Sequence, residues 1–147
     1  MIDRKQIGRT RPPHTTEVEK GRLRFFAKAI GEANRIYTDE RAAQEAGFRS
    51  LPAPLTFTFC LENDVPDPFA FLESLGVDVR RLLHGEQSFK YFAPVYAGDS
   101  LTFETRVSDI YDKKAGTLEF IVLDTDVRNQ TGVLVAEQRS ALVLRSA

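Results

Sequence analysis

Polar and apolar side chains alternate along much of the second half of the chain. The alternation is regular over residues 87–91 and 101–108, and denser apolar runs fill residues 117–127 and 133–144. Regular alternation is typical of a strand with one buried face, and a dense apolar run is typical of a strand covered on both faces. Turn-forming residues separate the segments, at 97–99, 113–116 and 129–132. The pattern predicts four consecutive strands in an antiparallel meander.

The first half of the chain has helical signals. Thr16 and Glu19 have the spacing of a capping box, and apolar residues then recur at helical intervals from Leu23 to Ile30. Further short helices are predicted over residues 40–46, with Thr38 or Asp39 as the cap, and from Asp67-Pro68 to about residue 76. The polar residues before Thr16 predict an irregular arm, with His14 at its surface.

A fourth helix, which lies between the last two along the chain, is predicted from Leu55 to about Asn63. Pro54 suits its first turn, and the segment is apolar on nearly every side, with only Thr56, Thr58 and Glu62 polar. A short helix of that composition needs a structure around it that buries it. We therefore predict an α+β fold, in which an antiparallel sheet wraps around this central helix.

Composition limits the class of protein. The chain has 147 residues, 42% of them hydrophobic, which suits one domain over residues 1–147. The formal net charge is only -1, with no basic face for nucleic acid, and the single Cys60 excludes an internal disulfide or a Cys-based metal cluster. The N-terminus is too polar for a signal peptide and no apolar run is long enough to span a membrane, so we expect a cytoplasmic protein.

Four segments together resemble the MaoC-like dehydratase family, in the branch called FAS1-like or MaoC N-terminal dehydratase domains. They are Gly31-Glu-Ala-Asn-Arg-Ile-Tyr-Thr-Asp39, Leu51-Pro-Ala-Pro-Leu-Thr-Phe57, His84-Gly-Glu-Gln87 and Pro94-Val-Tyr-Ala-Gly-Asp99. The resemblance implies a hotdog fold that dimerises by joining sheets. It also implies dehydration of (3R)-hydroxyacyl thioesters of coenzyme A or carrier protein, or hydration of the enoyl thioester, without a metal or redox cofactor.

The same resemblance identifies candidate catalytic residues and shows a departure. The family motif has an Asp, an Asn-Pro pair and a His; here Glu32 takes the place of the Asp, Asn34 that of the Asn, Arg35 that of the Pro, and Tyr37 that of the His. Elimination of water needs a base for the α-proton and an acid for the departing hydroxyl. Tyr37 has a reference pKa near 10 and is a poor base, although it can donate a proton.

Further candidates lie elsewhere in the chain. His84 is a third catalytic candidate, because branch members carry a similar His-Gly-x-Gln segment, and Gln87 and Asn34 are expected to bind substrate. Ala53, Leu55 and Thr56 are expected to hold the acyl thioester beside the start of the central helix, where backbone N–H groups are free. The three catalytic candidates also have purely structural interpretations. Glu32 can be a solvated carboxylate, Tyr37 a packing residue and His84 a structural residue of the strand.

The sequence leaves three functions open. The first is a hydro-lyase that acts as a homodimer or higher homo-oligomer. The second is a non-catalytic hotdog subunit, whose MaoC-like partner carries the Asp–His pair. The third, an acyl-CoA thioesterase, fits the motif order less well. The missing His favours the second function unless Glu32, Tyr37 or His84 restores the acid–base chemistry.

Overall fold

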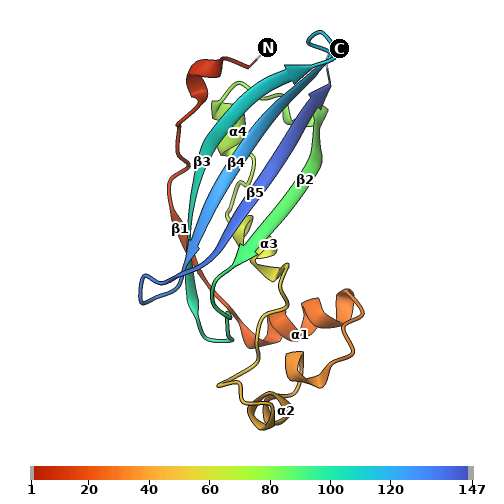
Figure 1. Cartoon of the computed structure of the whole chain (residues 1–147), viewed down its shortest axis with the longest axis vertical. Helices are drawn as coiled ribbons and strands as arrows, with labels where there is room; N and C mark the ends of the chain where they lie inside the picture. Colours follow the sequence, from red (N-terminus) through yellow and green to blue (C-terminus); the bar gives the residue numbers. More distant parts are fainter. Residues whose placement is uncertain (1, 146–147) are drawn as a thin grey trace.

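The computed structural model describes residues 2–145 (Figure 1). Within them one antiparallel sheet contains five strands in the order β1-β3-β4-β5-β2. The strands are β1 (His14–Glu17), β2 (Leu82–Tyr91), β3 (Ser100–Lys113), β4 (Leu118–Arg128) and β5 (Leu134–Arg145). The α-helices are α1 (Lys20–Ala29), α2 (Glu40–Glu45), α3 (Phe57–Glu62) and α4 (Ala70–Ser74). Single turns of 3-10 helix cover Arg4–Gln6, Arg35–Tyr37 and Val79–Arg81.

The strand order corrects the predicted four-strand meander. Strands β3, β4 and β5 do follow one another as hairpins, but β2 pairs with the far side of β5, and β1 lies beside β3. A tight hairpin forces its two strands to be neighbours, whereas residues 92–99 form a connection long enough to carry the chain across the sheet to β3, on the far side of β4 and beside β1. Strands β1 and β2 are therefore the two edges.

Helix α3 packs against the inner face of the sheet, between α4 and the end that carries α1 and α2 (Figure 1). Phe57 and Leu61 of α3 lie in a buried cluster with residues of the sheet and of α1, including Leu23 and Phe103. A second buried cluster joins α4 to the other half of the sheet, through residues such as Leu72, Ile121 and Leu142. The expected α+β architecture, a sheet around a central helix, is present.

The prediction that the central helix is buried on all sides is wrong. The helix is shorter than expected, Cys60 is exposed, and Leu55, which precedes the helix, is 61% exposed. Two of the polar residues are buried instead, Thr58 and Glu62, and they lie on the same face as Phe57 and Leu61. Polar groups are buried where partners satisfy them, and the sheet supplies those partners, as described below.

The N-terminal region also differs from the prediction. His14 opens β1, stacks on Phe103 with 5.0 Å between ring centroids, and donates from Nε2 to the carbonyl oxygen of Leu61 at 3.1 Å. His14 is therefore half-buried rather than at the surface of an arm. Thr16 does not cap α1, since the helix begins later, at Lys20, with Glu19 as its N-cap residue.

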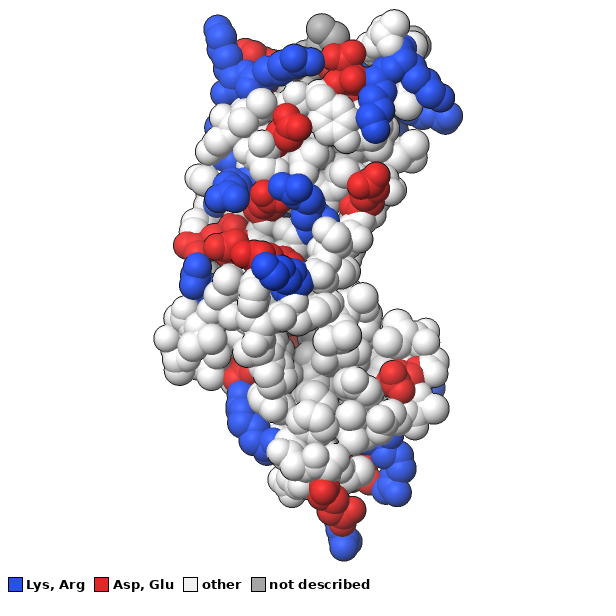
Figure 2. Space-filling model, in the orientation of Figure 1, with Lys and Arg blue, Asp and Glu red and all other residues white. Residues whose placement is uncertain are grey.

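The outer face of the sheet is charged. Figure 2 shows Lys and Arg beside Asp and Glu in bands across this face. Asp124 of β4, for example, pairs with Arg139 of β5 at 2.6 Å and with Arg106 of β3 at 3.5 Å. The two faces therefore have different roles, and the apolar face is the one that meets the helices. Among residues 2–145, no helix has the length and apolarity needed to cross a membrane.

Gly85 is required where β2 bulges between His84 and Glu86. A Cβ atom there would lie 2.7 Å from Val143 Cγ2 and 3.0 Å from the carbonyl oxygen of Ala141. We expect Gly85→Ala to lower the free energy of unfolding by about 1–3 kcal/mol, because the neighbouring strand must move. Gly21→Ala is the matched control: Gly21 lies in α1 with no atom within 4 Å of the added Cβ, and we expect a gain of about 0.5–1 kcal/mol. Urea unfolding measures both, and equal effects of the two substitutions would contradict this account of the bulge.

Candidate functional site

The side chains of Glu32 and Asn34 are used within their own turn. Glu32 Oε1 accepts a hydrogen bond from the backbone N–H of Asn34 at 2.8 Å, and Asn34 Oδ1 accepts one from the N–H of Ile36 at 3.2 Å. Asn34 thereby caps the 3-10 turn that carries Tyr37. Asn34 is exposed and Glu32 is half-buried. The local sequence thus fixes this turn, and Tyr37 is the member of the segment that reaches a cavity.

Tyr37 lines a cavity beside the start of α3, of about 170 Å³, which we call the α3 N-terminal cavity. Ala53 and Leu55 line it too, so three of the candidate residues meet here. The hydroxyl of Tyr91, which also lines the cavity, donates to the carbonyl oxygen of Leu55, and burial raises the pKa of Tyr91 above its ordinary value. The bond ties the loop before α3 to strand β2. Thr56 is the exposed N-cap residue of α3.

His84 lies at a different cavity, of about 430 Å³, between α3, α4 and the sheet, which we call the α3–α4 cavity. The ring of His84 lies 5.4 Å from that of Phe59, and its Nε2 donates to Gln87 Oε1 at 3.1 Å. Ser140 of β5 donates to the same oxygen. The Gln87 amide therefore joins His84 of β2 to Ser140 of β5.

Within one chain, the three catalytic candidates do not converge. Tyr37 lines the α3 N-terminal cavity, His84 lines the α3–α4 cavity, and Glu32 lines neither of them. No group of three or more His, Cys, Asp or Glu among residues 2–145 is arranged to hold a metal ion. A single copy therefore does not place an acid and a base from this set at one shared cavity.

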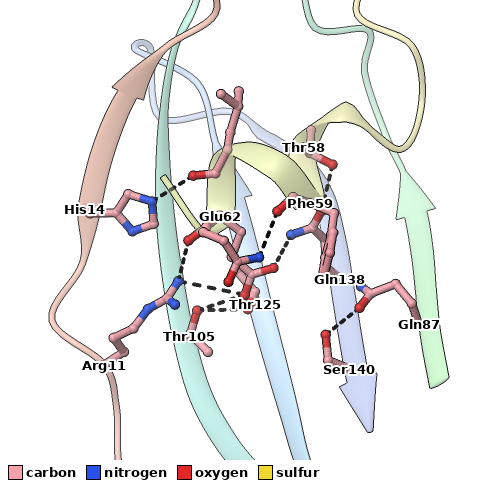
Figure 3. Close-up of polar contacts among 12 residues, drawn as sticks. Arg11, His14, Thr58, Phe59, Glu62, Gln87, Thr105, Thr125, Gln138 and Ser140 are labelled. Carbon is pink, nitrogen blue, oxygen red and sulfur yellow. Dashed lines mark hydrogen bonds and ion pairs between the residues drawn. The ribbon is translucent and has the colours of Figure 1, made fainter. Parts of the chain in front are cut away.

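The structure adds a buried polar network that sequence reasoning missed (Figure 3). Glu62 is only 5% exposed and points from α3 into the sheet. Its Oε1 accepts from Thr125 Oγ1 and its Oε2 from Gln138 Nε2, both at 2.7 Å, and Gln138 Oε1 in turn accepts from Thr58 at 2.7 Å. Since Thr58 lines one cavity and Glu62 the other, the network fixes the helix between them. The available signal was the four-residue spacing of Thr58 and Glu62, which puts both on one helix face.

Arg11 reaches the same network from the segment before β1 (Figure 3). Its guanidinium donates to the carbonyl oxygen of Glu62 at 3.1 Å and lies 3.8 Å from the carboxylate of the same residue. Burial lowers the pKa of Arg11 from its ordinary value, and the Glu62 carboxylate opposes that shift. The α3–α4 cavity therefore has a charged pair at one side of a wall that is otherwise largely apolar.

Comparison with known proteins places this geometry in a family. The family model described as "FAS1-like, dehydratase domain region" matches residues 5–138. A relative from Streptomyces griseus subsp. griseus, called UPF0336 protein, is 34% identical over 147 residues, which cover 99% of this chain and 97% of that protein. The name of that relative states no activity.

Solved structures agree with the family match. A chain in the crystal structure of C-terminally truncated HadBC, a (3R)-hydroxyacyl-ACP dehydratase complex from Mycobacterium tuberculosis, is similar with a TM-score of 0.81 and 28% identity, over 94% of this chain and 96% of that one. The MaoC-like dehydratase from Rhodospirillum rubrum has a TM-score of 0.71 at 21% identity, over 96% and 93% of the two chains, a likeness of fold alone. The chain therefore belongs to the FAS1-like dehydratase domain family and has the α+β hotdog fold of the MaoC-like dehydratases.

Proposed function

We propose that the chain is a subunit of a (3R)-hydroxyacyl-thioester dehydratase, or of an enoyl-thioester hydratase, that acts on acyl-CoA or acyl-carrier-protein substrates. In this proposal the chain shapes the acyl site, and a MaoC-like partner chain supplies the Asp–His pair. The observation that carries it is the separation of Tyr37 and His84 into two cavities, with Glu32 in neither. Removal of the α-proton and protonation of the leaving hydroxyl need both groups at one substrate.

The thioester carbonyl is proposed to lie beside the start of α3. Pro52 and Pro54 have no N–H, and the N–H of Ala53 donates to the carbonyl oxygen of Val95 at 2.8 Å. The backbone N–H groups of Leu55 and Thr56 are therefore the donors proposed to polarise the carbonyl. An oxygen that gains negative charge in the transition state is stabilised by such preorganised donors.

Two observations support a heteromeric arrangement. The likeness to the HadBC complex, at 28% identity, concerns an assembly of more than one kind of chain. Strand β2 is an edge of the sheet. Leu83 within this strand and Phe92 just after it are both exposed. An unpaired edge with exposed apolar residues is a surface that another chain can cover.

The test is a titration of this chain into a MaoC-like chain that carries the Asp–His pair, encoded in the same genome. Hydration of crotonyl-CoA and decenoyl-CoA is followed for each chain alone and for the mixture. We expect the hydration rate with this chain alone to equal that in buffer. The hydration rate of the mixture should be about a hundred- to ten-thousand-fold higher than that of either chain alone, because the mixture combines the acyl site with the groups that transfer protons. The rate should reach its plateau at equal amounts of the two chains. A mixture no faster than its partner chain alone would contradict the proposal.

A second candidate is a homo-oligomer that is active without a partner. The position of His84 on the edge strand β2 favours it, because a second copy that paired there would bring its own groups near this His. Hydration by this chain alone, lost in both Glu32→Gln and His84→Ala, would select this candidate. Light scattering during the same assay gives the number of chains in the active species, which we expect to be at least two.

A further inference from the structure

Helix α1 carries four cationic side chains and no acidic ones. They are Lys20, Arg22, Arg24 and Lys28. Two of them are neutralised by neighbouring elements, since Lys20 pairs with Glu40 at 2.7 Å and Arg22 pairs with Asp64 at 2.6 Å. The pKa of Glu40 is lowered mainly by the hydrogen bond from Lys20, and to a smaller extent by the charge of Arg24. The carboxylates around α1 are therefore already engaged by the first two cations.

Arg24 and Lys28 form no ion pair with a carboxylate of residues 2–145. Both side chains are exposed, and the guanidinium of Arg24 donates to the carbonyl oxygen of Thr38 at 2.9 Å. Glu32 follows Lys28 by about one turn, but its carboxylate accepts from the backbone N–H of Asn34. Helix α1 thus keeps two positive charges that a partner outside the chain can compensate.

Phe25 lies on the same side of the helix as these two cations. Residues 24, 25 and 28 fall within about 100° of one another around a helix of 3.6 residues per turn. Phe25 is 76% exposed, more than any other large hydrophobic side chain among residues 2–145. Aromatic rings and arginines are enriched where proteins bind one another. We call the surface formed by Arg24, Phe25 and Lys28 the α1 surface.

The α1 surface lies next to the turn that carries Tyr37. Thr38, which accepts the hydrogen bond from Arg24, directly follows Tyr37, and Tyr37 lines the α3 N-terminal cavity. No residue of the α1 surface lines that cavity or the α3–α4 cavity. Small ligands bind in concave sites, whereas an exposed helix face suits a protein. Charge complementarity requires that protein to be acidic, with an apolar side chain to meet Phe25.

We propose that the α1 surface docks an acidic carrier protein that delivers the acyl thioester. Arg24 and Lys28 face carboxylates of the carrier protein, and Phe25 contacts an apolar side chain between them. The proposal rests on the proposed acyl-thioester function, and it narrows the substrate from coenzyme A or carrier protein to carrier protein. The thioester, carried on the flexible arm of the carrier protein, then reaches the α3 N-terminal cavity past the turn of Tyr37.

The experiment compares two carriers of the same saturated acyl group, which can be neither hydrated nor dehydrated. Decanoyl-CoA and the decanoyl thioester of the acyl carrier protein encoded in the same genome are titrated into the purified chain, and into its mixture with the partner chain. We expect the carrier-protein thioester to bind roughly ten-fold tighter, because it adds contacts at the α1 surface. That difference should shrink as salt is added, since exposed charges are screened. Equal affinity for the two carriers would overturn the proposal.

Lys28→Glu tests the surface with least risk to the fold, because the Lys28 side chain is exposed and in no ion pair. We expect it to weaken binding of the carrier-protein thioester by roughly ten-fold, since attraction becomes repulsion, and to leave decanoyl-CoA unaffected. Phe25→Ala should also weaken only the carrier-protein thioester, without a change in salt dependence. Lys5→Glu is the control of equal charge change, since its 3-10 turn lies at the other end of the sheet from α1 (Figure 1).

Three results would overturn the proposal. Unchanged binding of the carrier-protein thioester by Lys28→Glu would show that the cations do not face it. Equal weakening of decanoyl-CoA would assign the α1 surface to the free cofactor. Sedimentation of the chain with phosphatidylglycerol vesicles, lost in Lys28→Glu and found together with no carrier-protein binding, would assign the surface to a membrane.

These results are separable from the proposed function. Docking of the carrier protein requires no proton transfer, so the docking can hold while the hydratase titration fails. Conversely, a mixture that hydrates decenoyl-CoA rapidly, while Lys28→Glu leaves carrier-protein binding unchanged, would retain the function and exclude the docking surface.

Discussion

Replacing Leu61 by Asp is expected to prevent the chain from accumulating as soluble folded protein. Leu61 is fully buried at the centre of the cluster that joins α3 to the sheet. An unpaired carboxylate there costs several kcal/mol, which is a large part of the roughly 5–15 kcal/mol that stabilises a domain. Expression followed by size-exclusion chromatography and circular dichroism measures the outcome.

The neighbouring Cys60 provides the matched control, because it is exposed on the same short helix. We expect Cys60→Asp to change the free energy of unfolding by less than about 1 kcal/mol, as surface substitutions usually do. Leu61→Ala should fold but lose about 2–5 kcal/mol in urea unfolding, from the cavity it leaves. If the Leu61→Asp and Cys60→Asp proteins were equally soluble and equally stable, α3 would not pack against the sheet through Leu61.

Local signals in the sequence were sufficient for much of the fold. The turns between strands were predicted because they depend on a few adjacent residues, and Gly98, Gly116 and Gly132 all have positive φ angles there. Asp39 caps α2 by accepting from two backbone N–H groups, as one of the two predicted candidates. Asp67 likewise accepts from the N–H groups of Phe69 and Ala70 before α4.

Features that depend on distant residues were not predictable in the same way. The partner of β2 is set by the packing of the whole sheet, so alternation within residues 82–91 does not reveal it. Helix α3 has only six residues, too few for its periodicity to show which face is buried. The burial of Glu62 depends on Thr125 and Gln138, which lie more than sixty residues further along the chain.

The candidate site was predicted in part. Tyr37, Ala53 and Leu55 do line one cavity, since the loop before α3 brings them together. The separation of His84 from them depends on the strand order, which the sequence did not predict correctly. Arg11 gave no signal at all, because it lies in a polar segment that predicted only an irregular arm.

The second large effect is expected in the active mixture of this chain and its partner. Substitution of the partner's catalytic His by Ala should lower kcat for hydration by about a hundred- to ten-thousand-fold, because it removes the acid–base group. Tyr37→Phe, Glu32→Gln and His84→Ala in this chain should each lower kcat by less than about ten-fold. Changes in KM are expected instead for Tyr37→Phe, since Tyr37 lines the α3 N-terminal cavity and touches no reacting proton in this account.

The most direct test of the central claim is therefore kcat for decenoyl-CoA hydration, measured in mixtures in which one chain at a time carries its substitution. We expect kcat to fall with substitution of the partner's His and to survive both Glu32→Gln and His84→Ala, with the fold unchanged by circular dichroism. A fall of a hundred-fold or more with either substitution in this chain, at unchanged complex formation, would contradict it and assign the proton transfers to this subunit.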